Sequence, residues 1–162
     1  TAVVDKYTLP QRYLQDFKAR RFTVKGAFFP EDLRLVDASG NVVDFASLKG
    51  HIVYIDMWAS WCVPCRKEIP HLQKLEAEMA GSNVKFLSIS IDRKSDDWKK
   101  ALTQLDLHGL QWHDEDGKLA NALNVKGIPF FLIYDKEGRL YRYNAPRPSS
   151  GEKLKVLLKG LE

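Results

Sequence analysis

The chain has 162 residues, 44% of them hydrophobic, and 25 Lys and Arg against 21 Asp and Glu give a formal net charge of +4. This length suits about one domain with its own core, and no apolar run approaches the ~18–20 residues that a membrane helix needs. The basic residues are dispersed and lack the basic stripe with aromatic platforms typical of nucleic-acid proteins. We therefore expect neither nucleic-acid binding nor membrane insertion within this segment.

Residues 1–28 differ from the rest of the chain because they are rich in aromatic and basic side chains. Thr8-Leu9-Pro10-Gln11 has the pattern of a helix capping box with proline in the first turn. The predicted helix has one apolar face, formed by Leu9, Tyr13, Leu14 and Phe17. We interpret residues 1–28 as an N-terminal extension or a linker from a possible preceding domain, and residues 29–162 as the main domain.

The next predicted elements lead up to a buried strand. Alternation over Asp32–Val36 predicts a strand, a turn follows at residues 37–41, and Val42–Phe45 is the predicted return strand. A brief helical turn is expected over Ser47–Gly50. Residues 51–57 are continuously apolar apart from Asp56 after the initial His51, which predicts a central strand buried on both faces.

A helix is predicted over residues 66–79, after the cysteines. Its apolar stripe is Ile69, Leu72, Leu75, Ala77 and Met79, and its charged residues, Glu68 among them, are expected to be mostly solvated. Residues 84–91 predict a second central strand, Ser95 is the expected cap of a helix over residues 96–105, and residues 121–123 are expected to end a short helix.

The C-terminal part predicts a hairpin and a final helix. Residues 130–134 and 139–143 form the hairpin strands, joined by a turn at residues 135–138. Ser149–Glu152 has the pattern of a capping box for a helix whose inward residues are Leu154, Leu157, Leu158 and Leu161. The order strand–helix–strand–helix, then a hairpin and a helix, predicts an α/β fold with a mixed central sheet and helices on both faces.

The chemistry of the chain is concentrated in Cys62-Val63-Pro64-Cys65, which contains the only two cysteines. A CxxC between a buried strand and a helix start is the arrangement expected of a thiol–disulfide exchange enzyme. The helix N-terminus favours a thiolate at Cys62, the predicted nucleophile, and Cys65 one turn later is the predicted, less exposed resolving thiol. The alternative, a static structural disulfide, would close a tiny loop and gain little loop entropy.

Metal binding is not expected. Two cysteines are too few for a four-cysteine zinc site, and the four histidines, His51, His71, His108 and His113, are scattered without ligand spacing. We expect no cofactor other than the redox-active disulfide itself.

Three motifs together resemble a known family. They are Trp61–Cys65 followed by Arg66–Pro70, a helical insertion after the strand at residues 84–91, and Val125–Pro129 directly before the strand at residue 130. The chain is similar, over roughly residues 30–160, to the thioredoxin fold and within it to the TlpA/ResA-like extracytoplasmic thiol–disulfide oxidoreductases. This resemblance implies a cis Pro129 lying against the disulfide.

Two acids are candidate catalytic residues beside the cysteines. Asp56 corresponds to the buried acid that exchanges a proton with the resolving cysteine in thioredoxin-like enzymes, and desolvation should raise its pKa. Its alternative is an Asp at a surface edge. Glu68 lies three residues after Cys65, near it on the same helical face, and ResA-like proteins carry a glutamate here. Its alternative is an ordinary solvated residue, and which acid handles the proton stays open.

The predicted substrate-binding residues are Trp61, Val63, Pro64, Ile128 and Pro129. Trp61 is expected to cover the disulfide as apolar contact surface, and Ile128 to pair with an extended substrate backbone beside the cis-proline. Trp58 is either a second flanking residue or core, whereas Trp98 and Trp112 are expected in the core.

The predicted function is reduction of disulfides in extracytoplasmic proteins through Cys62 and Cys65. Protein disulfides or thiols are the expected substrates, and an upstream electron-donor protein is the expected partner. The alternatives are a disulfide-donating oxidase and a non-catalytic binding module on a thioredoxin fold. The resemblance implies a periplasmic or otherwise extracytoplasmic location, with any anchor in a missing N-terminal part.

Overall fold

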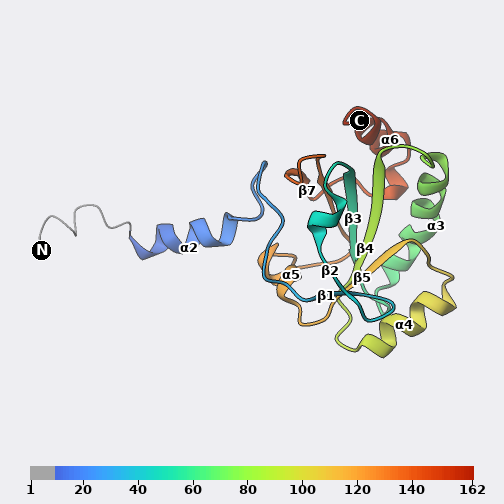
Figure 1. Cartoon of the computed structure of the whole chain (residues 1–162), viewed down its shortest axis with the longest axis horizontal. Coiled ribbons are helices and arrows are strands. Elements are labelled where there is room, and N and C mark those ends of the chain that lie inside the picture. The colour runs from blue at the N-terminus through green and yellow to red at the C-terminus, as the bar shows by residue number, and fades with distance from the viewer. Residues whose placement is uncertain (1–9) are drawn as a thin grey trace, which may run out of the picture.

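The computed structural model describes residues 10–162 and contains a seven-stranded mixed sheet in the order β2-β1-β5-β4-β3-β6-β7 (Figure 1). The strands are β1 (Leu35–Asp37), β2 (Val42–Val43), β3 (Ile52–Trp58), β4 (Val84–Ser90), β5 (Leu110–Asp114), β6 (Phe130–Tyr134) and β7 (Leu140–Tyr143). The helices are α2 (Gln11–Arg20), α3 (Val63–Glu78), α4 (Ser95–Gln104), α5 (Lys118–Ala122) and α6 (Glu152–Lys159), with 3₁₀ turns η1 (Phe45–Leu48) and η2 (Pro148–Ser150). The predicted α/β class with a mixed sheet is confirmed.

Strand β3 is the centre of the sheet, and all of its residues are buried, as its apolar sequence predicted. It pairs in parallel with β4 and antiparallel with β6, so both edges of its backbone are hydrogen-bonded. Its successive side chains point to opposite faces of the sheet. Ile52 and Tyr54 pack with residues of α3 and α6 on one face, while Val53 and Ile55 pack with α5 and η1 residues on the other. Helices therefore cover both faces, as predicted.

Helix α3 follows β3 after a short loop, and its N-terminus carries the two cysteines. Cys62 is the N-cap and Pro64 lies in the first turn, where the missing N–H of proline costs little. Two expectations for this helix are wrong. Ala77 is exposed, although the sequence pattern places it in the apolar stripe, and Glu68 is only 8% exposed, although the pattern places it among the solvated charges.

Strand β5 is absent from the predicted order of elements. Leu110, Gln111, Trp112 and His113 alternate between apolar and polar, but this alternation spans only four residues and ends at Asp114, so it is a weak signal. The strand forms because β4 pairs with it in parallel on one side and β1 pairs antiparallel on the other. His113 is nevertheless completely buried, and its ring stacks on Trp98 of α4.

Several predicted boundaries also differ. Asp32 has φ 58°, a left-handed conformation that breaks an extended strand, and β1 begins only at Leu35. Ser95 is the first residue of α4 instead of its cap. The N-cap of α6 is Gly151, which has no side chain for capping, and Ser149 of the expected capping box is bonded to Glu68 instead. Of the expected N-terminal capping box, Thr8 and Leu9 lie outside the described residues.

The N-terminal segment has two parts. Helix α2 projects away from the sheet (Figure 1), with Phe17 69% exposed. The chain after it contacts β7, since the Gly26 N–H donates to the Leu140 carbonyl and the Leu140 N–H donates to the Ala27 carbonyl. Phe29 then stacks on Phe45 with ring centroids 4.1 Å apart. The domain start at residue 29 stays a prediction, and we propose that the folded unit reaches back to about residue 22.

Two truncations test where the folded unit begins. Deleting residues 1–21 is expected to leave the melting temperature within about 2 °C, because α2 buries little apolar surface. Deleting residues 1–29 also removes the Phe29 ring and the bonds to β7, and should lower it by about 10 °C. Thermal unfolding followed by circular dichroism measures both. Equal loss in the two variants would contradict the proposed start near residue 22.

Candidate active site

A disulfide joins Cys62 and Cys65 at the carboxyl end of β3, with their Cα atoms 5.3 Å apart. The Cys65 N–H donates to Sγ of Cys62 at 3.2 Å. A sulfur at this position faces the unpaired N–H groups and positive dipole end of α3, which favour a thiolate once the disulfide opens. Cys62 is 4% exposed and Cys65 3%, so the expected difference in exposure is hardly present in this disulfide form.

The predicted substrate-binding residues surround this disulfide on two segments. Trp61 and Val63 flank Cys62 and are 67% and 61% exposed, which makes them apolar surface open to a partner. From the other segment, the Ile128 carbonyl oxygen lies 3.8 Å from Sγ of Cys62, and the Ile128–Pro129 peptide bond is cis. Pro64, also exposed, completes the group. Their role in binding substrate stays a prediction.

Asp56 lies on β3 beneath the site and is 8% exposed, so its alternative as a surface-edge residue is wrong. Ser88, its neighbour in β4, donates an Oγ–H to Oδ1 at 2.5 Å. Desolvation raises the pKa of Asp56 to about 7, with the Ser88 bond lowering it and the negative charge of Glu76 raising it further. A carboxyl with this pKa can both accept and release a proton near neutral pH.

Glu68 faces a different partner. Its Oε2 accepts the Ser149 N–H at 2.9 Å, and its Oε1 accepts the Ser149 hydroxyl at 2.6 Å. Both carboxylate oxygens therefore hold η2 against α3. Its alternative as a solvated residue is wrong, since it is buried. A catalytic role for Glu68 stays a prediction, and the contacts with Ser149 favour a structural one.

Asp92 was not singled out from the sequence, yet it holds the loop that precedes Cys62. Its carboxylate accepts the Ser60 N–H at 3.1 Å, the Ser60 hydroxyl at 2.7 Å and the Ser90 hydroxyl at 2.6 Å. Nε2 of His113 donates to the Asp92 carbonyl at 2.6 Å, and Asp92 is 2% exposed. The ends of β3, β4 and β5 are thereby tied together. The one signal in the sequence is an acid directly after a buried strand.

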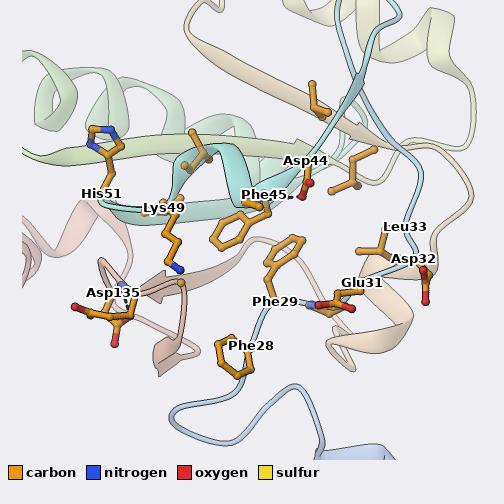
Figure 2. Close-up of a pocket in the computed structure, with 18 of the residues that line it drawn as sticks. Phe28, Phe29, Glu31, Asp32, Leu33, Asp44, Phe45, Lys49, His51 and Asp135 are labelled. Atoms are coloured by element: carbon orange, nitrogen blue, oxygen red, sulfur yellow. Dashed lines mark hydrogen bonds between the residues drawn. The ribbon is translucent and has the colours of Figure 1, made fainter.

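The larger of two notable cavities is not at the disulfide (Figure 2). Its volume is about 580 Å³, and the stacked rings of Phe29 and Phe45 lie at its centre, with Glu31, Asp32 and Asp135 around it. None of the predicted site residues lines it. The smaller cavity, about 360 Å³, is lined by Asp56 and adjoins the site from below.

Residues 10–162 contain neither a candidate metal site nor a candidate membrane span. No three or more His, Cys, Asp and Glu side chains gather there in an arrangement suited to a metal ion. Along the same residues, none of the helices combines the length and apolarity needed to cross a membrane.

The fold and the site define a class: a mixed sheet, a CxxC at a helix N-terminus and a cis-proline facing it are the features of a thioredoxin-fold protein. Residues 13–157 match the model of the Redoxin family. The chain belongs to the Redoxin family.

Named relatives agree with this assignment. Thiol-disulfide oxidoreductase ResA of Bacillus cereus is 26% identical over 106 residues, which cover 65% of this chain and 61% of the relative. The chain thus spans less than two thirds of the length of that curated relative. A crystal structure from Bacteroides vulgatus, provisionally assigned as a thiol-disulfide oxidoreductase, is 32% identical with a TM-score of 0.78, over 86% of this chain and 97% of the other.

A second solved structure, from Chlorobium tepidum, is provisionally assigned as the thiol:disulfide interchange protein DsbE. It is 30% identical with a TM-score of 0.75, over 86% of this chain and 99% of the other. The predicted thioredoxin-like fold and the resemblance to ResA-like oxidoreductases are therefore confirmed.

The contacts of Asp92 lead to a test by paired variants. Asp92→Ala should release the Ser60 amide, whose hydrogen exchange should accelerate at least about tenfold because its acceptor is gone. Asp114→Ala is the matched control, since buried Asp114 accepts the Leu119 and Ala120 N–H groups in the same way. There, only the start of α5 should lose protection. Amide exchange measured by NMR reports both sites, and unchanged Ser60 protection in Asp92→Ala would contradict the anchoring role.

The pKa of Asp56 predicts how stability depends on pH. Because burial raises this pKa to about 7, the folded protein holds the proton more tightly than the unfolded chain. Ionising Asp56 therefore costs stability as the pH rises from about 4 to about 7. Asp56→Asn removes that cost and should stabilise the protein at pH 8 by on the order of 2–4 kcal/mol, with little gain at pH 4. Urea unfolding at the two pH values measures this change in the free energy of unfolding. An equal change at both pH values would refute the pH dependence assigned to Asp56.

Proposed function

We propose that the protein is a thiol–disulfide oxidoreductase that reduces disulfides in other proteins through Cys62 and Cys65. The observation that supports this most directly is the Cys62–Cys65 disulfide at the start of α3, with the Ile128 carbonyl 3.8 Å from Sγ of Cys62. The names of the relatives agree with this activity.

The reduced form carries out the first step. The Cys62 thiolate attacks one sulfur of the substrate disulfide, which forms a mixed disulfide and releases the other substrate sulfur as a thiolate. An ordinary cysteine has a pKa of about 8.5 and is mostly protonated at neutral pH. The α3 N-terminus contributes up to about 2 kcal/mol toward the thiolate, and the Cys65 N–H, 3.2 Å from Sγ of Cys62, adds a charge-assisted bond.

The second step releases the substrate. Cys65 gives its proton to the Asp56 carboxylate, and its thiolate attacks Sγ of Cys62 in the mixed disulfide. This restores the Cys62–Cys65 disulfide and frees the second substrate thiolate, so the substrate has gained two electrons. Asp56 suits this step because its pKa of about 7 matches neutral conditions, whereas both oxygens of Glu68 are bonded to Ser149. We therefore assign the proton to Asp56.

The proposed site of substrate contact is the surface around the disulfide. Trp61, Val63 and Pro64 would pack against apolar side chains of an unfolded or extended segment, since they are exposed. The backbone of Ile128 would pair with that segment by strand addition beside Pro129. Such backbone pairing recognises extended chains of many sequences, which suits a protein substrate.

The cycle needs two electrons to return to Cys62 and Cys65, so we propose an upstream dithiol protein as the donor. We also propose an extracytoplasmic location, by likeness to ResA-like proteins. Disulfides form and persist mainly in such oxidising compartments.

Trapping of the intermediate tests the two cysteine roles. Cys65→Ser should accumulate a mixed disulfide with a disulfide-containing protein, because no resolving thiol remains to release it. Cys62→Ser is the matched control and should trap at least about tenfold less, since the helix N-terminus and the Cys65 N–H favour the thiolate at Cys62. Non-reducing gel electrophoresis after acid quenching measures the adduct. Equal trapping by the two variants would contradict the assigned order.

The reduction potential distinguishes the proposal from its alternatives. Equilibration of the wild-type protein with glutathione or dithiothreitol should give a value near the thioredoxin value of about −270 mV for a reductase. A value near about −120 mV would instead identify a disulfide donor. A disulfide that does not cycle would leave the binding module as the remaining function.

A further inference from the structure

The smaller cavity connects the buried acid of the site with the surface on the α3 side of the sheet. It has a volume of about 360 Å³, and its lining includes Asp56 and Trp58 of β3, Glu76 of α3, Ser88 of β4, and His108 and Gln111 near the start of β5. His108 is largely exposed, whereas Asp56 is buried, so the cavity runs from the protein interior to its rim.

Several polar groups belong to the otherwise mostly apolar lining of this cavity. Ser88 donates to Asp56 there, and two further buried atoms, Nε1 of Trp58 and Oε1 of Gln111, have no hydrogen-bond partner among residues 10–162. A cavity of this size whose lining residues carry such donors and acceptors has both the room and the polar partners that water needs. Water there would hydrogen-bond these groups and carry protons between them.

Glu76 is the acid of α3 that lines the same cavity, three helical turns after Cys65. Its negative charge acts on Asp56, and burial raises its own pKa above the usual range. Glu76 is half-buried while Asp56 is buried, so burial disfavours the charged form of Asp56 more strongly. The remaining titratable groups are Tyr54 on β3, on which the charge of Asp56 acts, and, in the lining of the cavity, Asp106 and His108.

We propose that Glu76 is a positioning residue that links Asp56 to solvent through the water of this cavity and sets the pH at which Asp56 exchanges its proton. The inference rests on the proposed function, in which Asp56 takes the proton of Cys65. That proton then leaves Asp56 through cavity water to Glu76 and the solvent, and it returns by the same route when the disulfide is reduced. No electron moves in this step, and one proton is exchanged with the solvent per cycle.

The direct test is the titration of the Asp56 carboxyl, followed by carbon NMR in the oxidised protein. Glu76→Gln removes a neighbouring negative charge, so the Asp56 midpoint should move down by about half a pH unit. Glu76→Lys should move it further in the same direction. The matched control is Glu78→Gln on the same helix, because Glu78 pairs with Lys155 and does not line the cavity. This control should titrate as the wild type does.

The kinetic test measures proton transfer. In dilute buffer, release of a mixed disulfide by Glu76→Gln should be a few-fold slower than in wild type, and added imidazole should restore the rate by carrying the proton. An Asp56 midpoint in Glu76→Gln equal to that of Glu78→Gln would overturn the inference, as would a slow rate that imidazole leaves unchanged. Asp56→Asn distinguishes a failure of the proposed function from a failure of the inference about Glu76. If this variant releases the mixed disulfide at the wild-type rate, the proposed role of Asp56 fails, whatever the titration gives.

Discussion

The structure depends on one constraint, the complete burial of β3 between two neighbouring strands and two layers of helices. The last residue of β3 lies at one end of the sheet, and the chain passes from there through a short loop into α3. The end of the strand and the start of the helix therefore meet at one place. Cys62 occupies that place, where the unpaired N–H groups of the helix are available to its sulfur.

The same arrangement favours opposite charge states in two groups of the site, Cys62 and Asp56. Cys62 lies at a helix N-terminus, which favours its charged form. Asp56, six residues earlier on β3, has one hydroxyl donor, Ser88, and an otherwise desolvated carboxyl, so its neutral form is favoured and its pKa is about 7. One secondary-structure unit thus carries a sulfur position that favours an anion and a carboxyl that favours its neutral form, the two properties that the proposed stepwise exchange uses.

Local sequence signals were sufficient where a pattern and its structure lie within one segment. The apolar run of β3, the CxxC, the proline in the first turn of α3 and Ile128-Pro129 before β6 all predicted what the structure contains. The prediction failed where the structure of a segment depends on a partner that is distant in sequence. Strand β5 has only a four-residue alternation in its sequence, and its pairing with β1 and β4 on its two edges makes it a strand. Ser149 has the local form of a helix cap, but Glu68 takes its N–H and hydroxyl instead.

The sequence by itself determined the class of fold, the redox pair and the acid beneath it, because the spacing of Asp56, Cys62 and Cys65 along a strand and a helix fixes their order in space. Only the tertiary structure decided what the remaining acids do. Glu68 holds η2, Asp92 holds the loop at Ser60, and Glu76 shares a cavity with Asp56. The physical reason is that a carboxylate takes its role from the donors, charges and water that face it, and here most of these come from segments distant in sequence.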